Sequence, residues 1–277
     1  MITFPNAKIN LGLNIVERRP DGYHNLETVF YPVAIHDALE VNVMDEKFPS
    51  PFDCDIKVSN FAVEGDEQRN LVVRAYQLLK EDFPAMSRVH AHLYKSIPTQ
   101  AGMGGGSSDA SAMLLLLNKM FDLGIGRQQL IDYAARLGAD CPFFIMNQPC
   151  YAEGIGERLA PVSLNLQGWY LAVVRPNIPV PTKEAFARVM PQRPLVNCRD
   201  IVLRPVEEWR DALVNDFEAS VFAQHPEIGD VKEMLYHMGA TYAAMSGSGS
   251  AVFGLFHQKP EFEGVFKGMF KTVVFLP

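Results

Sequence analysis

A run of three consecutive glycines limits what this chain can fold into more than any other feature of its sequence. Residues 104–106 are all glycine, and they follow Gly102 and Met103. Before them, residues 89–95 alternate between apolar and polar side chains, which is typical of a strand. After them comes a segment rich in Ala, Met and Leu, which favours a helix, and Ser107 at its start is a good N-cap residue. The sequence therefore predicts a strand, a glycine-rich loop and a helix that begins at Ser107.

This arrangement favours a loop that binds phosphate. Glycines carry no Cβ, so backbone N–H groups can approach a ligand closely. The start of a helix adds unpaired N–H groups and about half a positive charge. A flexible loop or a tight packing turn is the alternative for a bare run of glycines. No Lys follows the glycines, Ser107 stands where a dinucleotide-binding loop has its third glycine, and the protein-kinase motifs are absent.

Strand and helix patterns occur in both halves of the chain. Residues 8–15 alternate with a period of two, and a Pro-Asp-Gly turn at residues 20–22 leads to a returning strand at residues 26–33. In the second half we expect strands at residues 169–174, 240–245, 251–256 and 272–276, a helix at 182–190 capped by Thr182, three helices between 207 and 238, and a last helix at 260–269. Two α+β domains, residues 1–160 and 161–277, with a cleft between them, are therefore expected.

Charge and cysteine content exclude several classes of protein. The 25 Lys and Arg residues against 32 Asp and Glu residues give a net charge of −7, which speaks against a nucleic-acid binder. Four cysteines without a CxxC pair fit reduced thiols better than disulfides or a zinc site. No segment has the length and apolarity of a membrane span, and no signal peptide is visible. We expect a soluble, cytoplasmic protein.

A few polar residues stand where chemistry is expected. Lys8 and Asn10 share one face of the first strand, and Asp140 precedes a Cys-Pro pair. An ammonium beside a carboxylate keeps it ionised, and such a carboxylate can accept the proton of a hydroxyl nucleophile. Taken alone, Lys8 is better explained as a solvent-facing lysine and Asp140 as a helix cap. Tyr23 and His24 end the Pro-Asp-Gly turn, where Tyr23 could also simply pack on the hairpin.

Several segments together resemble the GHMP kinase superfamily. The phosphate loop of that superfamily is similar to PTQAGMGGGSSDA at residues 98–110. PNAKINL at 5–11, RPDGYH at 19–24, GADCPFF at 138–144 and SGSGS at 246–250 follow the order found in the 4-diphosphocytidyl-2-C-methyl-D-erythritol kinase branch. Met103 and Cys141 depart from the residues that are frequent there, Leu and Val, without removing a catalytic group. The resemblance implies two domains, the first like domain 2 of ribosomal protein S5 and the second α+β, with the active site in a cleft between them.

The resemblance also implies a reaction and a set of site residues. ATP phosphorylates the 2-hydroxyl of a cytidine diphosphate-linked methylerythritol, a precursor in the non-mevalonate isoprenoid pathway, with Asp140 as base and Lys8 as its partner. Mg²⁺ is expected, and Ser108 is the candidate for its ligand. Residues implied for ATP are Asn70, Lys95, Pro98, Ala101, Gly102, Met103, Gly104, Gly105, Gly106, Ser107 and Ser108. Residues implied for the acceptor are Asn10, Tyr23, His24, Thr182 and Phe186, with Tyr23 and Phe186 on the two sides of the cytosine.

Two other functions remain open on the sequence. A related kinase for a mevalonate-type or homoserine-type substrate would share the loop but would not need Tyr23 and His24 to hold a base. A nucleotide sensor without catalysis would share the fold, but the presence of both Lys8 and Asp140 speaks against it. The expected partners are small molecules, with neither nucleic acid nor membrane, and the expected state is a monomer or a weakly associating homodimer. The role of residues 246–250, a hairpin turn or a loop near the phosphates, is left open.

Overall fold

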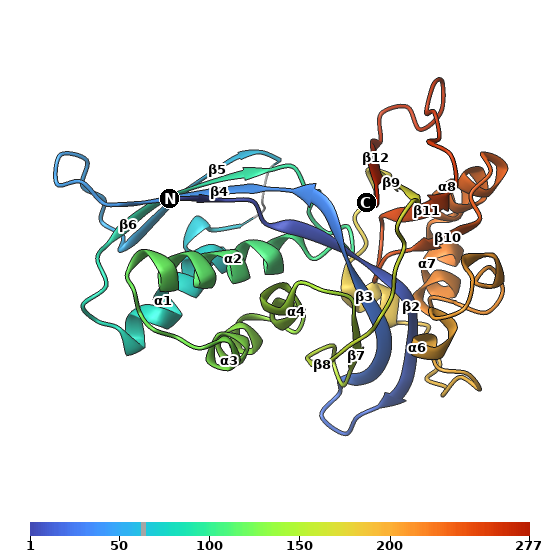
Figure 1. Ribbon diagram of the computed structural model, residues 1–277, viewed down its shortest axis with the longest axis horizontal. Helices are drawn as coiled ribbons and strands as arrows, with labels where there is room; N and C mark the ends of the chain where they lie inside the picture. The colour runs from blue at the N-terminus through green and yellow to red at the C-terminus, as the bar shows by residue number, and fades with distance from the viewer. Residues whose placement is uncertain (62–64) are drawn as a thin grey trace. The chain divides into compact units, whose positions relative to one another are not determined.

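The computed structural model describes residues 1–61 and 65–277, which form two compact units (Figure 1). The first unit contains Met1–Ala7, Ala34–Thr99 and Gly104–Gln148. The second contains Lys8–Val33, Gln100–Met103 and Pro149–Pro277. The units are interleaved along the chain, because the N-terminal hairpin pairs with a strand that begins at Cys150. The boundary that the sequence predicts near residue 160 does not coincide with this division and stays a prediction for the family's two domains.

A four-stranded sheet forms one layer of the first unit. Its order is β1 (Ile2–Thr3), β4 (Ala38–Val43), β6 (Val89–Lys95) and β5 (Cys54–Asn60). The pair β5 and β6 is parallel, so its connection crosses over through η1 (Glu67–Arg69) and α1 (Leu71–Asp82). The helices α2 (Gly105–Met120), α3 (Arg127–Leu137) and α4 (Cys141–Met146) lie with α1 on the same side of the sheet (Figure 1).

The alternation that predicts β6 also decides which of its faces is buried. Val89, Ala91 and Leu93 are at most 3% exposed and belong to the core with α1 and α2. His90 and His92 point to the other face, where each has a partner on β5: His90 lies beside Asp55 and His92 beside Ser59. The two histidines therefore have separate polar partners.

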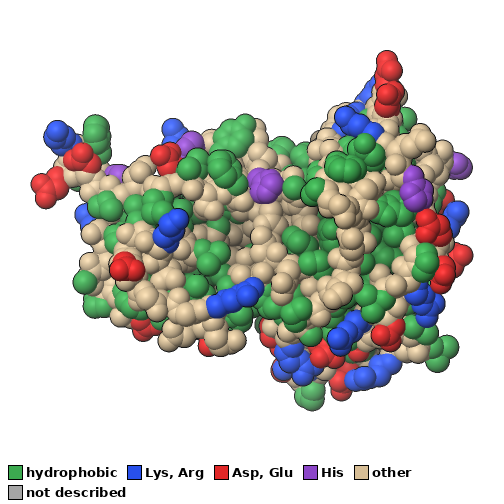
Figure 2. Space-filling view, viewed as in Figure 1, with side chains coloured by type: hydrophobic (Ala, Val, Ile, Leu, Met, Phe, Trp, Pro, Cys, Tyr) green, Lys and Arg blue, Asp and Glu red, His purple; other side chains and the backbone are tan. Residues whose placement is uncertain are grey.

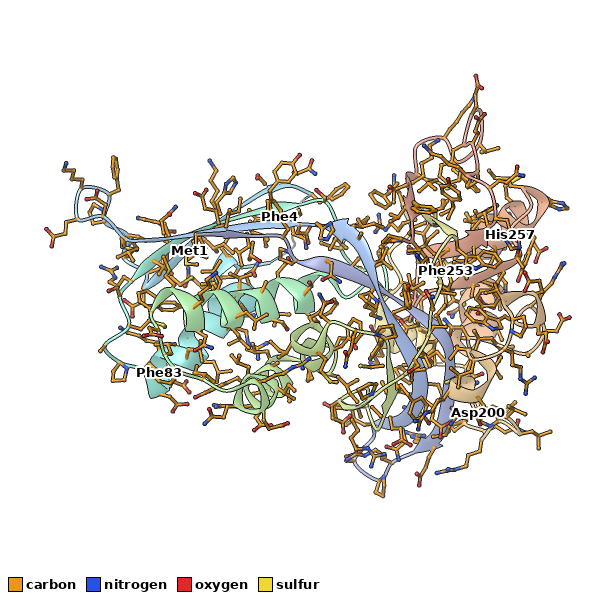
Figure 3. All side chains as sticks on the ribbon, viewed as in Figure 1. Met1, Phe4, Phe83, Asp200, Phe253 and His257 are labelled. Carbon is orange, nitrogen blue, oxygen red and sulfur yellow. The ribbon has the colours of Figure 1, made fainter. Side chains whose placement is uncertain are left out.

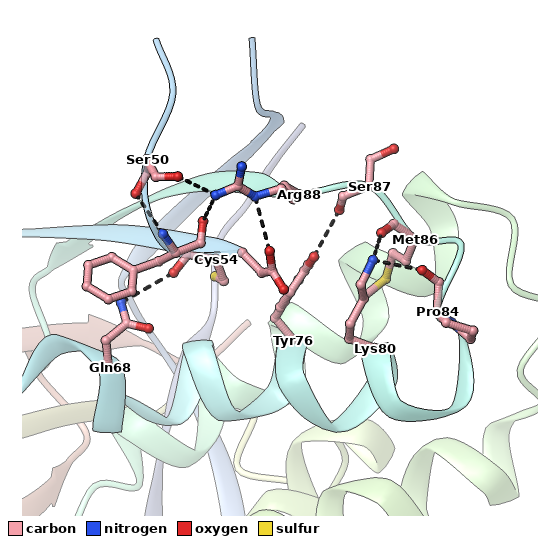
Figure 4. Close-up of polar contacts among 11 residues, drawn as sticks. Ser50, Cys54, Gln68, Tyr76, Lys80, Pro84, Met86, Ser87 and Arg88 are labelled. Carbon is pink, nitrogen blue, oxygen red and sulfur yellow. Dashed lines mark hydrogen bonds and ion pairs between the residues drawn. The ribbon is translucent and has the colours of Figure 1, made fainter. Parts of the chain in front are cut away.

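Polar contacts fix the segment that leads from α1 into β6 (Figure 4). Lys80 Nζ donates to Pro84 O at 2.9 Å, and Tyr76 OH donates to Ser87 O at 3.1 Å. Arg88 Nη2 donates to Phe52 O at 2.8 Å, which ties the start of β6 to the loop before β5. The strand that leads into the glycine loop is thus held at Arg88, the residue before it begins.

Two sheets make up the second unit. In one, β10 (Tyr242–Met245), β11 (Val252–Phe256), β9 (Tyr170–Arg175) and β12 (Phe270–Phe275) are antiparallel in this order. Helices α7 (Phe217–Gln224) and α8 (Pro226–His237) share a core with it, and Phe253 of β11 is completely buried (Figure 3). In the other sheet, β2 (Asn6–Arg18), β3 (His24–His36), β7 (Cys150–Glu153) and β8 (Arg158–Pro161) follow one another.

The hairpin that the sequence predicts is confirmed and is longer than predicted. β2 and β3 are neighbours in the sheet, and the turn between them is closed by Arg19 N–H donating to Tyr23 O at 2.8 Å. The unit also contains the short helices α5 (Thr182–Phe186), α6 (Cys198–Ile201) and η2 (Val206–Glu208).

Three helix predictions are corrected. No helix forms at residues 260–269, because Gly264 and Gly268 adopt φ of +77° and +73°, which a right-handed helix does not allow. The helix predicted from Thr182 to residue 190 ends at Phe186, and its N-cap is Pro181 rather than Thr182. The helix after the glycine loop begins at Gly105, two residues before the predicted Ser107.

The surface of the protein carries charged groups of both signs (Figure 2). Within residues 1–61 and 65–277, none of the helices has both the length and the apolarity needed to cross a membrane. On the face seen in Figure 2, acidic and basic side chains are interspersed with apolar ones. All four cysteine side chains are buried.

Candidate functional site

The start of α2 has the geometry of an anion site. Gly104 is the N-cap with φ of +69°, a left-handed conformation that favours glycine, and it makes no side-chain capping bond. The first helical hydrogen bond runs from Ser108 N–H to Gly104 O at 2.9 Å. The N–H groups of the preceding residues therefore point past the end of the helix, where its dipole favours a negative charge.

A buried cluster of three charges lies directly under this start. Lys95 at the end of β6 is 2% exposed, and its ammonium group pairs with Asp37 and, at 2.7 Å, with Asp109 of α2. Asp37 Oδ1 also accepts the N–H groups of Ser96 and Ile97. Burial raises the pKa of Asp109 to about 7, although the Lys95 charge opposes the shift. Two carboxylates and one ammonium thus connect the end of β6 to the first turn of α2.

Some of the residues predicted to contact ATP are occupied in other ways. Lys95 is buried between two carboxylates, which supports a role in holding the loop rather than in touching the nucleotide. Asn70 is the N-cap of α1, where its Oδ1 accepts Val72 N–H at 2.9 Å. Pro98 is buried, whereas Gly106 is exposed and Gly104, Gly105 and Ser107 are half-buried. The exposed edge of the loop is therefore made by its glycines and Ser107.

The residue that the sequence offers as a ligand for Mg²⁺ does not fit that role. Ser108, the candidate on the sequence, is 2% exposed, and Asp109 beside it is paired with Lys95. Among the described residues, no group of three or more His, Cys, Asp or Glu side chains could hold a metal ion. Because Mg²⁺ favours exposed oxygen ligands together with substrate phosphates, the buried Ser108 does not fit it.

Asp140 directly precedes Cys141, whose carbonyl group is linked to α2 by the Ser111 side chain. It takes the N-cap position of α4, but its carboxylate makes no capping hydrogen bond. Ser111 Oγ of α2 is 2.8 Å from Cys141 O and 2.9 Å from Ser107 O, and so joins the two helices. Burial raises the pKa of the Cys141 thiol to about 11, so this neighbour is a packing residue. The helix-cap alternative for the Asp140 side chain is therefore not supported.

Lys8 is a buried lysine rather than a solvent-facing one. It is 3% exposed, its Nζ donates to Asn10 Oδ1 at 2.6 Å, and it lies 4.9 Å from the centre of the Phe30 ring. Asn10 Nδ2 donates to Thr28 Oγ1 at 3.0 Å. Lys8, Asn10 and Thr28 therefore form one polar group on one face of the hairpin, with the Phe30 ring beside it. The period of two predicts this shared face for Lys8 and Asn10.

The first part of the glycine loop packs on the loop between β10 and β11. Ser246 Oγ donates to Gly102 O at 2.9 Å and accepts Asn10 N–H at 3.2 Å. Met103 O accepts Lys8 N–H at 3.0 Å, and Ala101 O accepts Ala251 N–H at 3.2 Å. Residues 246–250 are thus the hairpin loop between β10 and β11, and they also support residues 101–103. A position near the phosphates stays a prediction.

The residues predicted to hold the acceptor's base divide into an exposed and a stacked group. Tyr23 is 61% exposed and does not pack on the hairpin. His24 stacks on Phe186 with ring centroids 4.7 Å apart, and Phe186 meets Phe217 edge-on at 4.8 Å. Burial lowers the pKa of His24, with a smaller contribution from Arg18, so the ring favours its neutral form. Thr182 is exposed in the first turn of α5.

Sequence reasoning missed three residues of these groups. Thr28, Phe30 and Asp37 lie on or next to β3 and contact Lys8, Asn10 or Lys95. Thr28 and Phe30 alternate with the apolar Val29, a signal that could have placed them together on one face. Nothing local in the sequence indicates the partner of Asp37.

Comparisons with known proteins define the class of this chain. The model of the GHMP kinases N terminal domain matches residues 70–148, and that of the GHMP kinases C terminal domain matches residues 199–272. The Methanococcus jannaschii mevalonate kinase structure is similar with a TM-score of 0.71 at 10% identity, over 99% of this chain and 97% of the other, which supports the fold alone. The chain is therefore an ATP-dependent kinase with the two-domain α+β fold of the GHMP class, as predicted.

Closer relatives narrow the class. A Bacteroides thetaiotaomicron protein named 4-diphosphocytidyl-2-C-methyl-D-erythritol kinase is 53% identical over 259 residues, 92% of each chain. The protein of that name from Porphyromonas gingivalis is 46% identical over 95% of this chain and 94% of its own. A crystal structure of 4-(cytidine 5'-diphospho)-2C-methyl-D-erythritol kinase is 33% identical with a TM-score of 0.78, over 92% and 90% of the two chains. The chain belongs to the 4-diphosphocytidyl-2-C-methyl-D-erythritol kinase family.

Proposed function

We propose that this chain transfers the γ-phosphoryl group of ATP to the 2-hydroxyl of 4-diphosphocytidyl-2-C-methyl-D-erythritol, a step of the non-mevalonate isoprenoid pathway. The observation that carries the proposal is the 53% identity, over nine-tenths of both chains, to a relative named for that substrate. The resemblance to homoserine and mevalonate kinases is only 16% and 10% in identity, so it supports the shared fold and not their substrates.

In this proposal Asp140 is the general base. A hydroxyl is a poor nucleophile at neutral pH, and a positioned carboxylate that accepts its proton accelerates such a reaction by roughly 10²–10⁴. The absence of a capping bond from the Asp140 carboxylate is compatible with this role. The remaining barrier to phosphoryl transfer is lowered by positioning and by charge stabilisation. We propose that the attacking hydroxyl oxygen and the leaving oxygen of ADP lie in line with the transferred phosphorus.

Lys8 is proposed as the cationic partner in the reaction. Its ammonium group is buried, donates to Asn10 Oδ1 and lies over the face of Phe30. A positive charge in such an environment is desolvated, so it acts more strongly on a nearby negative charge than it would in water. It would favour the ionised base and the developing alkoxide.

The nucleotide phosphates are assigned to the start of α2. The backbone N–H groups after Gly104 and the helix dipole supply positive potential without a side-chain cation. Mg²⁺ would supply further neutralisation of the triphosphate when bound, although Ser108 does not fit as its ligand. For the acceptor, the exposed Tyr23 ring and the His24–Phe186 stack offer aromatic faces to the cytosine.

The assay that tests the substrate follows ADP release with ATP, Mg²⁺ and one acceptor at a time. We expect turnover with 4-diphosphocytidyl-2-C-methyl-D-erythritol and none with mevalonate or homoserine. Turnover with either of the latter in place of the cytidyl acceptor would show that the assignment of the substrate is wrong. ATP binding without any turnover would instead favour a nucleotide sensor.

The role of Asp140 is tested by Asp140→Asn. The amide keeps the shape of the side chain but cannot take a proton, so kcat is expected to fall by about 10²–10⁴ while ATP affinity changes little. Single-turnover rates and ATP titration calorimetry measure the two effects separately. A matched control is Asp132→Asn on the exposed side of α3, which should leave both quantities unchanged. A near-normal kcat for Asp140→Asn would remove this residue from the role of base.

A further inference from the structure

We propose that Thr28 is a positioning residue for this kinase: its hydroxyl fixes which end of the Asn10 amide faces Lys8, and thereby holds the Lys8 ammonium group for the reaction. This inference rests on the proposed role of Lys8. Thr28 lies on β3, is completely buried, and is not among the residues that the family resemblance brings to the site.

The chain of hydrogen bonds has only one possible direction. An ammonium group only donates, so the Asn10 atom 2.6 Å from Lys8 Nζ must be the amide oxygen. The other end of the amide is then an NH₂ group, which needs an acceptor, and it finds Thr28 Oγ1 at 3.0 Å. A threonine hydroxyl can accept there because it donates its own proton to the backbone carbonyl of Gly12.

The carbonyl at the end of this chain is held in place by the backbone. Gly12 adopts φ of +67° within β2, a conformation that disfavours any residue with a Cβ. A Cβ at this position would lie 2.6 Å from Leu213 Cδ1 and 2.9 Å from Cys198 Cβ. The Gly12 carbonyl group, which accepts the Thr28 hydroxyl, is therefore part of a tightly packed strand and is held in a fixed position.

Burial makes the orientation of the amide matter. Lys8, Asn10 and Thr28 are all at most 3% exposed, so little water is present to replace a lost partner. Without the Thr28 hydroxyl, the Asn10 NH₂ group loses its acceptor, and a rotated amide would turn its NH₂ group toward the ammonium. Ser246 does not replace it, because its Oγ is 3.5 Å from Asn10 Oδ1 and 2.9 Å from Gly102 O. The hydroxyl of Thr28 thus decides whether the Asn10 amide presents its oxygen or its NH₂ group to Lys8.

Thr28→Val and Thr28→Ser separate the hydroxyl from the shape of the side chain. Val keeps the volume and the β-branch, while Ser keeps the hydroxyl. We expect Thr28→Val to lower kcat about tenfold, the effect of one net hydrogen bond, with KM for ATP unchanged, and Thr28→Ser to restore kcat to within about twofold of the original. Circular dichroism and the melting temperature establish that both variants fold. If Thr28→Val does not fold, Thr28→Ala is judged by the same criteria.

A double-mutant cycle tests whether the effect passes through Asn10. In an Asn10→Ala background there is no amide to orient, so Thr28→Val should lower kcat no further. An equal additional loss in that background would show that Thr28 acts independently of Asn10. An unchanged kcat in Thr28→Val, or an equal loss in Thr28→Ser, would overturn the proposal.

A measurement without substrate keeps this inference distinct from the proposed function. The side-chain amide signals of Asn10 in a ¹⁵N–¹H spectrum should shift or broaden in Thr28→Val and stay in place in Thr28→Ser. The expected change in the Asn10 signals does not depend on which acceptor the enzyme phosphorylates. Lack of turnover with the cytidyl substrate would therefore not affect the proposed role of Thr28. Unchanged Asn10 signals in Thr28→Val would overturn the role of Thr28 alone.

Discussion

At the scale of single residues, glycine is required at positions 102 and 247 because two backbones approach each other closely there, rather than because the loops need flexibility. Gly102 has φ of +71°, and a Cβ built on it would lie 1.9 Å from Ser246 O. Gly247 on the opposing loop has φ of +55°, and its Cβ would lie 3.3 Å from the backbone of Gly102. The two loops touch through positions that have no side chain, so neither glycine can be replaced without moving the other loop.

Gly102→Ala should therefore be strongly destabilising. The added methyl group overlaps a carbonyl oxygen and also requires a left-handed backbone, so we expect the free energy of unfolding to fall by at least about 2 kcal/mol. Gly106→Ala is the matched control, because its Cβ would meet only Leu71 Cδ1 at 3.7 Å within a helix. Urea unfolding of the two variants provides the comparison. Equal stability of both variants would contradict the close approach.

At the scale of elements, α2 is joined to β6 by charge as well as by apolar packing. Lys95, Asp37 and Asp109 carry two negative charges and one positive charge in a buried place. Since burial raises the pKa of Asp109 to about 7, its carboxyl group is easily protonated and the cluster approaches neutrality. A helix start that is proposed to bind phosphate by its backbone would benefit from a support without surplus negative charge.

Lys95→Met tests the cluster. It leaves two buried carboxylates facing each other without a cation, which should cost about 3–5 kcal/mol of unfolding free energy. The exposed Lys57→Met on the adjacent strand should change it by less than about 0.5 kcal/mol. Urea denaturation gives both values. A loss in Lys95→Met no larger than in Lys57→Met would mean that the ion pairs contribute nothing.

Asp109→Asn tests the direction of the pKa shift. A carboxyl group whose pKa is higher in the folded protein than the unfolded value of about 3.9 binds its proton more tightly when folded. Its contribution to stability is therefore present at low pH and is lost as the pH rises from about 4 to 7. Asp109→Asn should abolish this part of the pH dependence in thermal melts. A steeper dependence of the melting temperature on pH in Asp109→Asn would contradict the raised pKa of Asp109.

At the scale of the whole molecule, thiols are distributed through the cores of both units. Burial raises the pKa of Cys54 and Cys198 to about 12 and that of Cys141 to about 11. None of these side chains is more than 2% exposed. The prediction of reduced, unreactive thiols that the sequence suggests is supported by their surroundings.

The folded protein should therefore become less stable in alkali. Unfolded thiols ionise above about pH 8.5, whereas these three stay protonated in the folded state until about pH 11–12. The folded state then binds more protons, so the free energy of unfolding falls as the pH rises from about 9 to 11. Iodoacetamide labelling at pH 8 should be slow in the native protein and fast in urea, with Ser163→Cys as an exposed control. Rapid native labelling of Cys141 would contradict its burial.

Much of the fold follows from local patterns. The alternation of residues 8–15 and 89–95 predicts strands β2 and β6, and for β6 it also predicts the buried face, whereas β2 is buried on both faces from Ala7 to Ile15. The glycine run predicts the loop, and the resemblance of five segments to the GHMP kinases predicts the family. The last predicted helix fails because positive φ at Gly264 and Gly268 is decided by how residues 260–269 turn toward β12, which helix propensity does not encode.

The sequence by itself determined the glycine-rich loop, the class of kinase and the face that Lys8 and Asn10 share, because these depend on residues close together in the chain. The tertiary structure decided the partners: Ser246 meets Asn10 across 236 positions, Asp37 meets Lys95 across 58, and Thr28 orients Asn10 across 18. The physical reason is burial. A polar group removed from water must find a partner, and only the packing of distant segments determines which partner is within reach.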